Sequence, residues 1–447
     1  MSLETYTFKN GFRVIHQKPN NKLGVCAIQV FLNFGSAHET DDTRGMAHFI
    51  EHMCFKGTKT IPIPTDLFIK QDNAGGTFNA NTNQRYTAYV CKIIDQDIAN
   101  TIPLLANMML HSTFVKKEFV KEENVVIEEC LRSADNPVDL LEYDSASIVY
   151  DGSSYQHSID KLAYHRKKYN YKSVVDLYRL FYRPDNMILS IVSDVPFRTI
   201  LNIVAKSDYA KSCGYSKKDL LDKRRHILYY SIPAPREIQY NFHEKPGLNT
   251  THVKISFITC NQFHEDRYVL NMLEHVLGGL FGSKLSILLR EKNGLTYTST
   301  STTEYHEHSG DISIYAQVNK HKVIRNGDKP GLLPLIIWLL NDLIKHGVTA
   351  EELSVAKRNK KAKLHLALDG LETQAEYNGK EWLLLQDPEK IIPINKIYDV
   401  RFKPVTRTQI HGVLRKYIKK NMMTVCFVGE EFPSRDVIDR ECRKLMG

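Results

Sequence analysis

The stretch from Gly45 to Thr58 contains the residues best suited to catalysis, in the pattern His48-x-x-Glu51-His52. On a helix, His48 and His52 would lie at positions i and i+4, one above the other on the same face. Two imidazoles on one face can bind one metal ion, and zinc favours nitrogen ligands. A carboxylate beside a zinc-bound water is placed to accept its proton, so Glu51 is the candidate general base. This order inverts the commoner zinc-protease motif, and the site needs a third ligand from elsewhere in the chain.

The third ligand is expected on an acidic stretch at residues 116–133 that is predicted to be helical. A catalytic zinc site usually has three protein ligands and a water. The candidates are Glu122, Glu123, Glu128 and Glu129. Because Glu122 and Glu129 are seven residues apart, they share one face of the helix, so one could coordinate while the other supports a ligand. Residue types alone do not rank the four glutamates.

The elements around these residues alternate between strands and helices. Residues 25–32 are predicted to form a central strand, followed by the helix that carries His48. Two strands that meet at a turn are predicted within residues 78–90, and two helices within 95–133. A strand at 186–192 ends this first half of the chain. The pattern predicts an α+β fold.

The second half of the chain repeats the first. The matching segments are Asn186–Asp194 with Asn421–Glu430, His38-Glu39 with His264-Glu265, and Ala47–His52 with Leu270–His275. Asn186 and Asn421 are 235 residues apart, His38 and His264 are 226 apart, and His48 and Asn271 are 223 apart. The matching segments therefore keep both their order and their spacing. Because Asn271 stands where the first half has His48, only the first half is expected to bind a metal.

The repeat predicts two similar domains, at residues 1–209 and 237–447. Residues 210–236 are rich in Lys, Ser, Asp and Pro and are interpreted as the linker between them. Each domain is expected to contain a mostly antiparallel or mixed β-sheet with helices packed on one face.

Composition and charge argue against several classes of protein. A hydrophobic content of 42% and a charged content of 25% are typical of a folded globular chain. No apolar run approaches the roughly 18 residues that span a bilayer. The basic runs at 223–225 and 357–361 contain no interleaved aromatic residues, so no nucleic-acid partner is expected.

Cysteine usage and the N-terminal sequence favour a cytoplasmic location. The eight cysteines form no Cys-x-x-Cys pair, which indicates buried thiols in a reducing compartment. The first residues match neither a secretory signal nor an organelle presequence.

The segment from Gly45 to Thr58 closely resembles the zinc helix of the family of pitrilysin, insulin-degrading enzyme and mitochondrial processing peptidase. The likeness continues through residues 75–82, which resemble the family's substrate-binding edge strand. Residues 289–297 resemble the segment whose arginine and tyrosine hold substrate, here Arg290 and Tyr297. Several independent motifs therefore carry the resemblance, over most of the chain.

The resemblance implies a zinc metalloendopeptidase with one zinc ion per chain. The family's spacing selects Glu129 as the third ligand, 77 residues after His52, with Glu122 as a supporting acid. Glu51 would take a proton from the water and pass it to the leaving amine.

The resemblance also implies how a peptide substrate is held. Asn79 and Ala80 would contact a peptide added as an extra strand, Arg290 would hold its backbone, and Tyr297 would hydrogen-bond the oxyanion. With two domains, the chain resembles the half-length members, such as the processing peptidase beta subunit, which pair into a chamber.

A homodimer or a heterodimer is therefore expected, with Arg290 and Tyr297 acting on the partner's zinc site and with unfolded peptides as substrates. The alternative is a catalytically silent structural or partner subunit of a processing-peptidase-like complex. Such subunits usually lose part of the metal motif, and this chain retains all of it.

Overall fold

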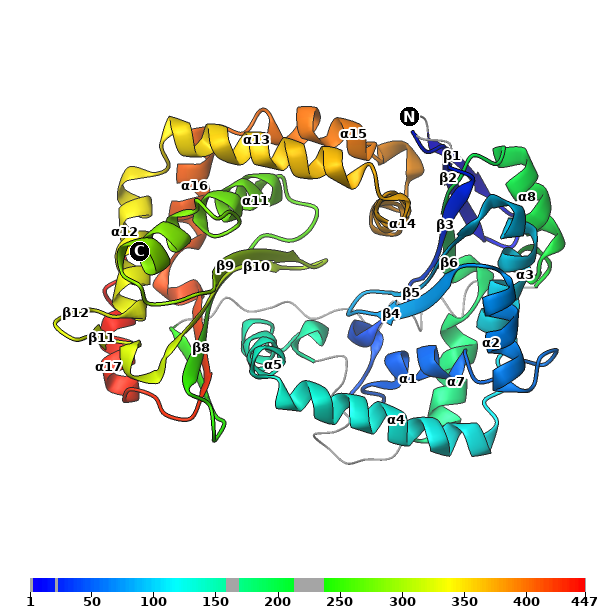
Figure 1. Ribbon diagram of the computed structural model, residues 1–447, viewed down its shortest axis with the longest axis horizontal. Coiled ribbons are helices and arrows are strands. Elements are labelled where there is room, and N and C mark those ends of the chain that lie inside the picture. The colour runs from blue at the N-terminus through cyan, green and yellow to red at the C-terminus, as the bar shows by residue number, and fades with distance from the viewer. Residues whose placement is uncertain (1–2, 21–22, 158–168, 213–236, 447) are drawn as a thin grey trace. The chain divides into compact units, whose positions relative to one another are not determined.

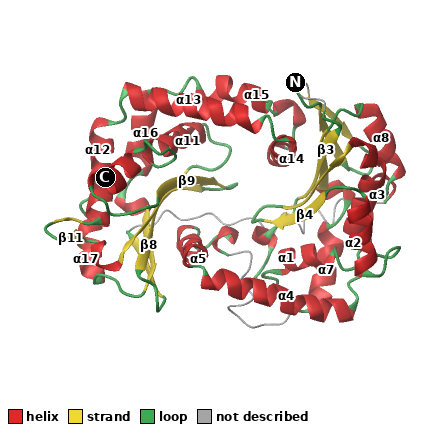
Figure 2. Ribbon diagram, in the orientation of Figure 1, coloured by secondary structure: helices red, strands yellow, loops and turns green. Residues whose placement is uncertain are grey.

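The computed structural model describes residues 3–20, 23–157, 169–212 and 237–446. The chain forms two compact units, each built on its own β-sheet, and Figure 2 shows the strands of both sheets in yellow. The first unit contains Met1–Leu131, His157–Tyr229 and Leu364–Ile397, and the second contains Arg132–Gln156, Tyr230–Lys363 and Tyr398–Gly447.

The first unit has a six-stranded mixed sheet with the strand order β1-β2-β6-β3-β5-β4. Its strands are β1 (Leu3–Thr7), β2 (Arg13–Gln17), β3 (Val25–Leu32), β4 (Thr77–Thr82), β5 (Thr87–Ile94) and β6 (Met187–Val192). Only β2 and β6 pair in parallel; the other neighbours are antiparallel. The central strand β3 is apolar on both faces because both are covered, as expected for a strand inside a layered fold.

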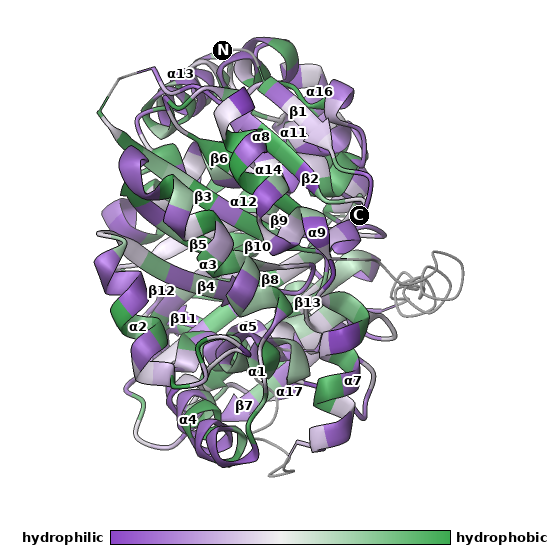
Figure 3. Cartoon of the chain, turned by 90° about the vertical axis from the view of Figure 1, so that its right-hand side faces the viewer, coloured by the Kyte–Doolittle hydropathy of each residue, from purple (hydrophilic) through white to green (hydrophobic). Residues whose placement is uncertain are grey.

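Helices of the first unit pack on one face of this sheet around a single large core. They are α1 (Met46–Met53), α2 (Pro64–Asn73), α3 (Ile98–Leu110), α4 (Lys116–Asp135), α7 (Tyr171–Phe181), α8 (Phe197–Lys206) and α9 (Asp208–Lys211); the short α15 (Ile394–Ile397) also belongs to this unit. Figure 3 shows hydrophilic and hydrophobic bands alternating along α7 and α8. In α7 the buried residues Val174, Tyr178 and Phe181 follow the i, i+4, i+7 spacing of an amphipathic helix.

The other face of the same sheet is covered by α14 (Leu371–Leu385), which comes from the second half of the sequence and lies against β3 and β6 (Figure 1). The helix approaches closely because residue 379 is glycine. A Cβ atom added there would lie 2.1 Å from a ring carbon of Phe31. Buried amides complete the contact, with Gln17 bonded to Gln374 and Asn378.

The second unit repeats this architecture in a five-stranded sheet with the order β7-β13-β8-β10-β9. Its strands are β7 (Gln239–Glu244), β8 (Thr250–Thr259), β9 (Ser299–Tyr305), β10 (Gly310–Asn319) and β13 (Met423–Gly429), and a separate hairpin pairs β11 (Arg325–Asn326) with β12 (Lys329–Pro330). Pairing is parallel between β7 and β13 and antiparallel elsewhere, as in the β2-β6-β3-β5-β4 part of the first sheet. The internal repeat read from the sequence therefore corresponds to one topology used twice.

The helices of the second unit follow the same order. They are α11 (Asp266–Leu277), α12 (Leu332–His346), α13 (Ala350–Ala367), α16 (Arg407–Tyr417) and α17 (Arg435–Cys442). By position in this order, α11 is the counterpart of α1, and α13 is the counterpart of α4. The sheet is also covered by α5 (Pro137–Val149), which comes from the first half and packs on β8 and β13.

Each unit thus takes one helix from the other half of the sequence, and the two exchanged helices, α5 and α14, occupy equivalent places in the repeat. The α+β fold with two similar sheets is confirmed, and the exchanged helix adds cover on the second face of each sheet. The compact units differ from the contiguous ranges 1–209 and 237–447 because α5 and α14 pack across that division. Most of the expected linker, residues 213–236, lies outside the described residues.

Within the described residues, no single helix is both long and apolar enough to cross a membrane; only the bent pair α12 and α13, taken together, meets that test of length and composition.

Candidate metal centre

The helix α1 carries the His48-x-x-Glu51-His52 pattern and begins after Gly45, whose φ of 79° is the left-handed conformation that glycine adopts readily. Its apolar side chains are buried in the core of the first unit; they are Met46, Ala47, Phe49, Ile50 and Met53. This burial fixes the rotation of the helix. His48 and His52 therefore emerge on the opposite side, partly accessible, with 12% and 19% of their side chains exposed.

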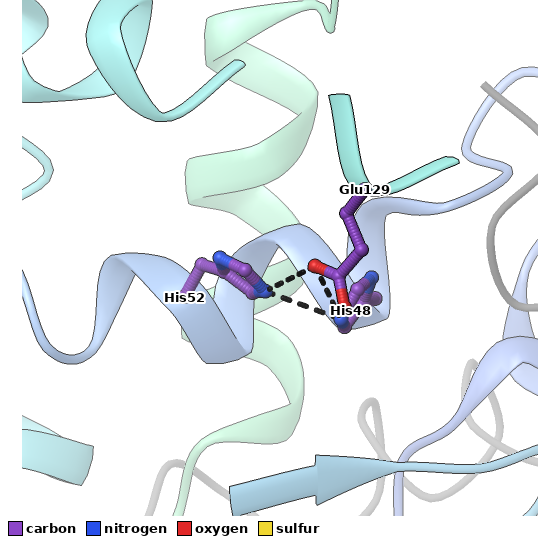
Figure 4. A group of neighbouring side chains, drawn as sticks. All are labelled: His48, His52 and Glu129. Atoms are coloured by element: carbon purple, nitrogen blue, oxygen red, sulfur yellow. Dashed lines mark hydrogen bonds and ion pairs between the residues drawn. The ribbon is translucent and has the colours of Figure 1, made fainter. Parts of the chain in front are cut away.

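Three side chains from α1 and α4 point toward one another at this place (Figure 4). The Nε2 atoms of His48 and His52 are 3.2 Å apart. The Oε2 atom of Glu129 lies 3.5 Å from Nε2 of His52 and 4.0 Å from that of His48. These atoms all lie within 4.8 Å of one another, close enough to share one metal ion. Two imidazole nitrogens and a carboxylate oxygen form a donor set that suits zinc.

Glu122 supports this group from behind. Its Oε1 atom lies 2.9 Å from Nδ1 of His52, and its Oε2 atom lies 2.7 Å from Nζ of Lys56. Burial alone would raise the pKa of Glu122, but the hydrogen bonds from His52 and Lys56 lower it. A charged carboxylate on Nδ1 orients the ring so that Nε2 faces the other donors, an arrangement common around metal-binding histidines.

The other two candidate glutamates are directed elsewhere. Glu123 is buried and accepts a hydrogen bond of 2.7 Å from the backbone N–H of Tyr169, while Glu128 is exposed. Of the four, the structure therefore brings only Glu129 to the Nε2 atoms of the two histidines, while Glu122 contacts His52 through Nδ1. Its role as third ligand stays a prediction.

Glu51 lies beside the histidines but is only 7% exposed. The hydroxyl of Thr82, the last residue of β4, donates a hydrogen bond of 2.6 Å to Oε2 of Glu51. Burial raises the pKa of Glu51, although the Thr82 hydroxyl and the nearby His48 oppose the shift. A carboxyl group with a raised pKa is suited to exchange a proton near neutral pH.

Asn79 and Ala80 lie in the middle of β4, which is the last strand at its edge of the described sheet. Asn79 is exposed and pairs with Val90, and its side-chain oxygen accepts a hydrogen bond of 2.9 Å from the backbone N–H of Ala80. One of the backbone donors expected to serve a substrate is thus occupied by the neighbouring side chain. The strand edge runs directly to Thr82 and so to Glu51.

Arg290 and Tyr297 belong to the second unit. Arg290 lies on a π-helical segment, Ser286–Lys292, and its guanidinium carbon is 4.9 Å from the centre of the Tyr297 ring. Tyr297 is 84% exposed. Both line a cavity of about 860 Å³, which the loop Gly278–Gly282 also borders. The structure brings these two residues together as a pair.

Sequence reasoning missed three residues that organise the site. Thr82, Lys56 and Glu39 contact Glu51, Glu122 and the start of α1, respectively. Lys56 and Thr82 lie within the segments singled out by motif. Their partners, however, are distant in sequence and become visible only in the folded chain.

Two models of the insulinase family of peptidases, family M16, match successive parts of the chain. The family's Insulinase model matches residues 14–161, and the model described as the M16 inactive domain matches residues 168–360. The zinc protease YmxG of Bacillus subtilis is 30% identical over 384 residues, which is 86% of this chain and 88% of that protein. The chain belongs to peptidase family M16.

Other M16 relatives extend over nearly the whole chain. The beta subunit of the mitochondrial processing peptidase of Bos taurus is 24% identical over 98% of this chain and 86% of its own length. Among solved structures, a protease from Helicobacter pylori has a TM-score of 0.86 at 23% identity and covers 96% of this chain and 99% of that one, which supports the fold. Within this M16 chain, Asn271 falls in the part matched by the inactive-domain model.

Proposed function

We propose that this protein is a zinc-dependent metalloendopeptidase that hydrolyses peptide bonds in unfolded peptides. The observation that carries the proposal is the convergence of His48, His52 and Glu129 beside the buried carboxyl group of Glu51. Membership of a family whose relatives are named zinc proteases supports the same conclusion.

The residues present fit zinc. His48, His52 and Glu129 supply two nitrogens and one oxygen, which leaves a fourth position for water. Glu122 holds Nδ1 of His52, as expected where the other ring nitrogen binds a metal. When bound, one zinc ion per chain would lower the pKa of water and polarise the substrate carbonyl.

Glu51 would act as the proton carrier of the reaction. Its raised pKa suits a group that accepts a proton from water and then delivers it to the leaving amine. The Thr82 hydroxyl donates a hydrogen bond to one carboxylate oxygen and thereby restricts the orientation of the carboxyl group. The partial burial of the site limits competing water around this proton transfer.

The edge of β4 would bind the peptide. A substrate added alongside Asn79 and Ala80 would extend the sheet by main-chain hydrogen bonds, a mode that accepts many sequences but requires an extended, unfolded segment. Because β4 ends at Thr82, a peptide on this edge would be directed toward Glu51.

Arg290 and Tyr297 would hold substrate and stabilise the oxyanion on the zinc site of a partner chain, in a homodimer or a heterodimer with a related half-length chain. Mixed dimers of Glu51→Gln and Arg290→Ala chains should then recover activity, because one of the two sites is intact. Absence of recovery in demonstrably mixed dimers would refute action in trans.

The second candidate function is a catalytically silent subunit, which the inactive-domain match over residues 168–360 favours. The deciding experiment measures bound zinc and cleavage of a library of quenched peptides, with Glu129→Gln compared with its exposed neighbour Glu128→Gln. An enzyme should bind one zinc per chain, lose cleavage with a chelator, and lose zinc in Glu129→Gln only. Tight zinc binding without cleavage of any peptide would favour the silent subunit.

A further inference from the structure

The carboxyl group of Glu39 caps the start of the helix that carries the histidines. It is 5% exposed, and its two oxygens accept separate backbone hydrogen bonds, from Gly45 N–H at 2.7 Å and from Ala47 N–H at 2.6 Å. The first N–H groups of a helix have no partner inside the helix. Glu39 therefore fixes the first turn of α1 immediately before His48.

The opposite side of the same peptide segment is also held. The Tyr169 hydroxyl donates to the carbonyl oxygen of Gly45 at 3.1 Å, and the Tyr169 ring stacks on Phe49 with centroids 4.3 Å apart. The backbone N–H of Tyr169 donates to Glu123 of α4. Gly45 is thus fixed through both its N–H and its carbonyl, and the start of α1 is tied to the helix that carries Glu129.

The second unit contains the same residue without the same contact. Glu265 is the counterpart of Glu39 in the repeat and precedes α11 directly, yet its side chain makes no capping bond to that helix. Instead it is 69% exposed and pairs with Arg401 at 2.6 Å. The buried cap is therefore found on the helix with two histidines, and its counterpart on the helix with Asn271 faces the surface.

We propose that Glu39 is a positioning residue that sets the zinc affinity of the site by fixing the first turn of α1 and hence the place of His48. This inference rests on the proposed zinc site and adds a determinant outside the ligands and the general base. An uncapped first turn would let His48 move relative to His52 and Glu129. Metal affinity depends on such outer contacts, because the ligands must converge within a few tenths of an ångström.

The test compares Glu39→Ala and Glu39→Gln with the matched control Glu265→Gln in the full chain. Zinc affinity is measured by competition with a chromophoric chelator, with no peptide present. We expect Glu39→Ala to weaken zinc binding by about tenfold or more, the lower end of the range for residues that support metal ligands. Glu39→Gln, which keeps the size but can accept only with its single oxygen, should weaken it less. Glu265→Gln should bind zinc like the wild type.

Thermal unfolding with and without zinc separates positioning from general stability, and Glu39→Gln carries the test if Glu39→Ala does not fold. A positioning role predicts that the zinc-induced rise in Tm shrinks in the Glu39 variants. Folded variants with wild-type zinc affinity, and an equal loss of Tm with and without zinc, would overturn the inference. Failure of the wild-type chain to bind zinc would instead refute the proposed function, so the two failures are distinguishable.

Discussion

The two halves of this chain place the same pair of helices beside the same kind of sheet, yet only one pair gathers metal-binding side chains. In the first unit, α1 and α4 bring His48, His52 and Glu129 together. In the second unit, α11 carries Asn271 at the place of His48, and Lys360 of α13 donates a hydrogen bond to its side-chain oxygen. The fold therefore supplies the location, and a few side chains decide what occupies it.

In the second unit, the ammonium group of Lys360 lies at the place that corresponds to the proposed metal site of the first unit. The Lys360 ammonium lies 4.6 Å from the centre of the Phe402 ring and is attracted by the carboxylate of Glu274, the counterpart of Glu51. Burial lowers the pKa of Lys360 to about 8, although Glu274 opposes the shift. A fixed positive charge beside Asn271 and Glu274 would repel a divalent ion, so we do not expect this place in the second unit to bind a metal.

The largest expected difference between the two halves is catalytic. Glu51→Gln should lower kcat by about 10²–10⁴-fold, the usual contribution of a general base, while zinc remains bound. Glu274→Gln, the same change at the counterpart position, should leave kcat unchanged. Peptide cleavage and zinc content measured on both variants check this. An equal loss of kcat in the two variants would mean that Glu51 is not the specific proton carrier.

The exchanged helices give a second comparison, because each contacts the central part of its sheet through a different pair of side chains. In the first unit, Gly379 of α14 meets Phe31 of β3. In the second unit, Ser145 of α5 meets Ser256 of β8, and their hydroxyls lie 3.2 Å apart. In the first contact, a large side chain faces a glycine that has no side chain. In the second contact, two small side chains face each other. Both combinations let the helix lie close to its sheet.

Gly379→Ser should therefore destabilise the first unit by about 1–3 kcal/mol, because the new side chain overlaps the buried ring of Phe31. The matched change Ser145→Gly should cost about 1 kcal/mol, from a weakened helix and a lost hydroxyl contact. Urea unfolding of both variants measures the difference. A neutral Gly379→Ser would show that α14 does not need this close approach.

The sequence predicts the repeat well because strand order and motif spacing are local properties of each half. It does not predict where α14 packs, since nothing in residues 371–385 shows that the helix covers the sheet of the other half. Thr82 and Glu39 were missed for the same reason. A hydroxyl and a carboxyl group are ordinary surface residues by type, and their roles arise from partners that folding brings near. The residue types likewise did not rank Glu129 above Glu123 as the third ligand, and only the family resemblance did so. In the folded chain, Glu123 is directed away from the histidines because it accepts a hydrogen bond from Tyr169.

The smallest expected effect concerns Lys360, whose contribution to the free energy of unfolding should depend on pH. Because its pKa is lower in the folded chain than the ordinary value, the unfolded chain binds more protons at this site between about pH 8 and 10.5. The contribution of Lys360 to the free energy of unfolding is therefore most favourable above that window and is lost as the pH falls through about 8. Relative to Lys360→Met, the wild type should gain about 1–2 kcal/mol between pH 7.5 and 9.5.

The measurement is urea unfolding of the metal-free protein at the two pH values, with Arg358→Met on the exposed side of α13 as the control, because arginine does not titrate in this range. Titration of all other groups cancels in the difference between wild type and variant. A difference that stays constant with pH would mean that the Lys360 ammonium is not confined beside Asn271. The second unit would then lack a built-in cation, and the expectation that it binds no metal would rest on Asn271 in place of a histidine alone.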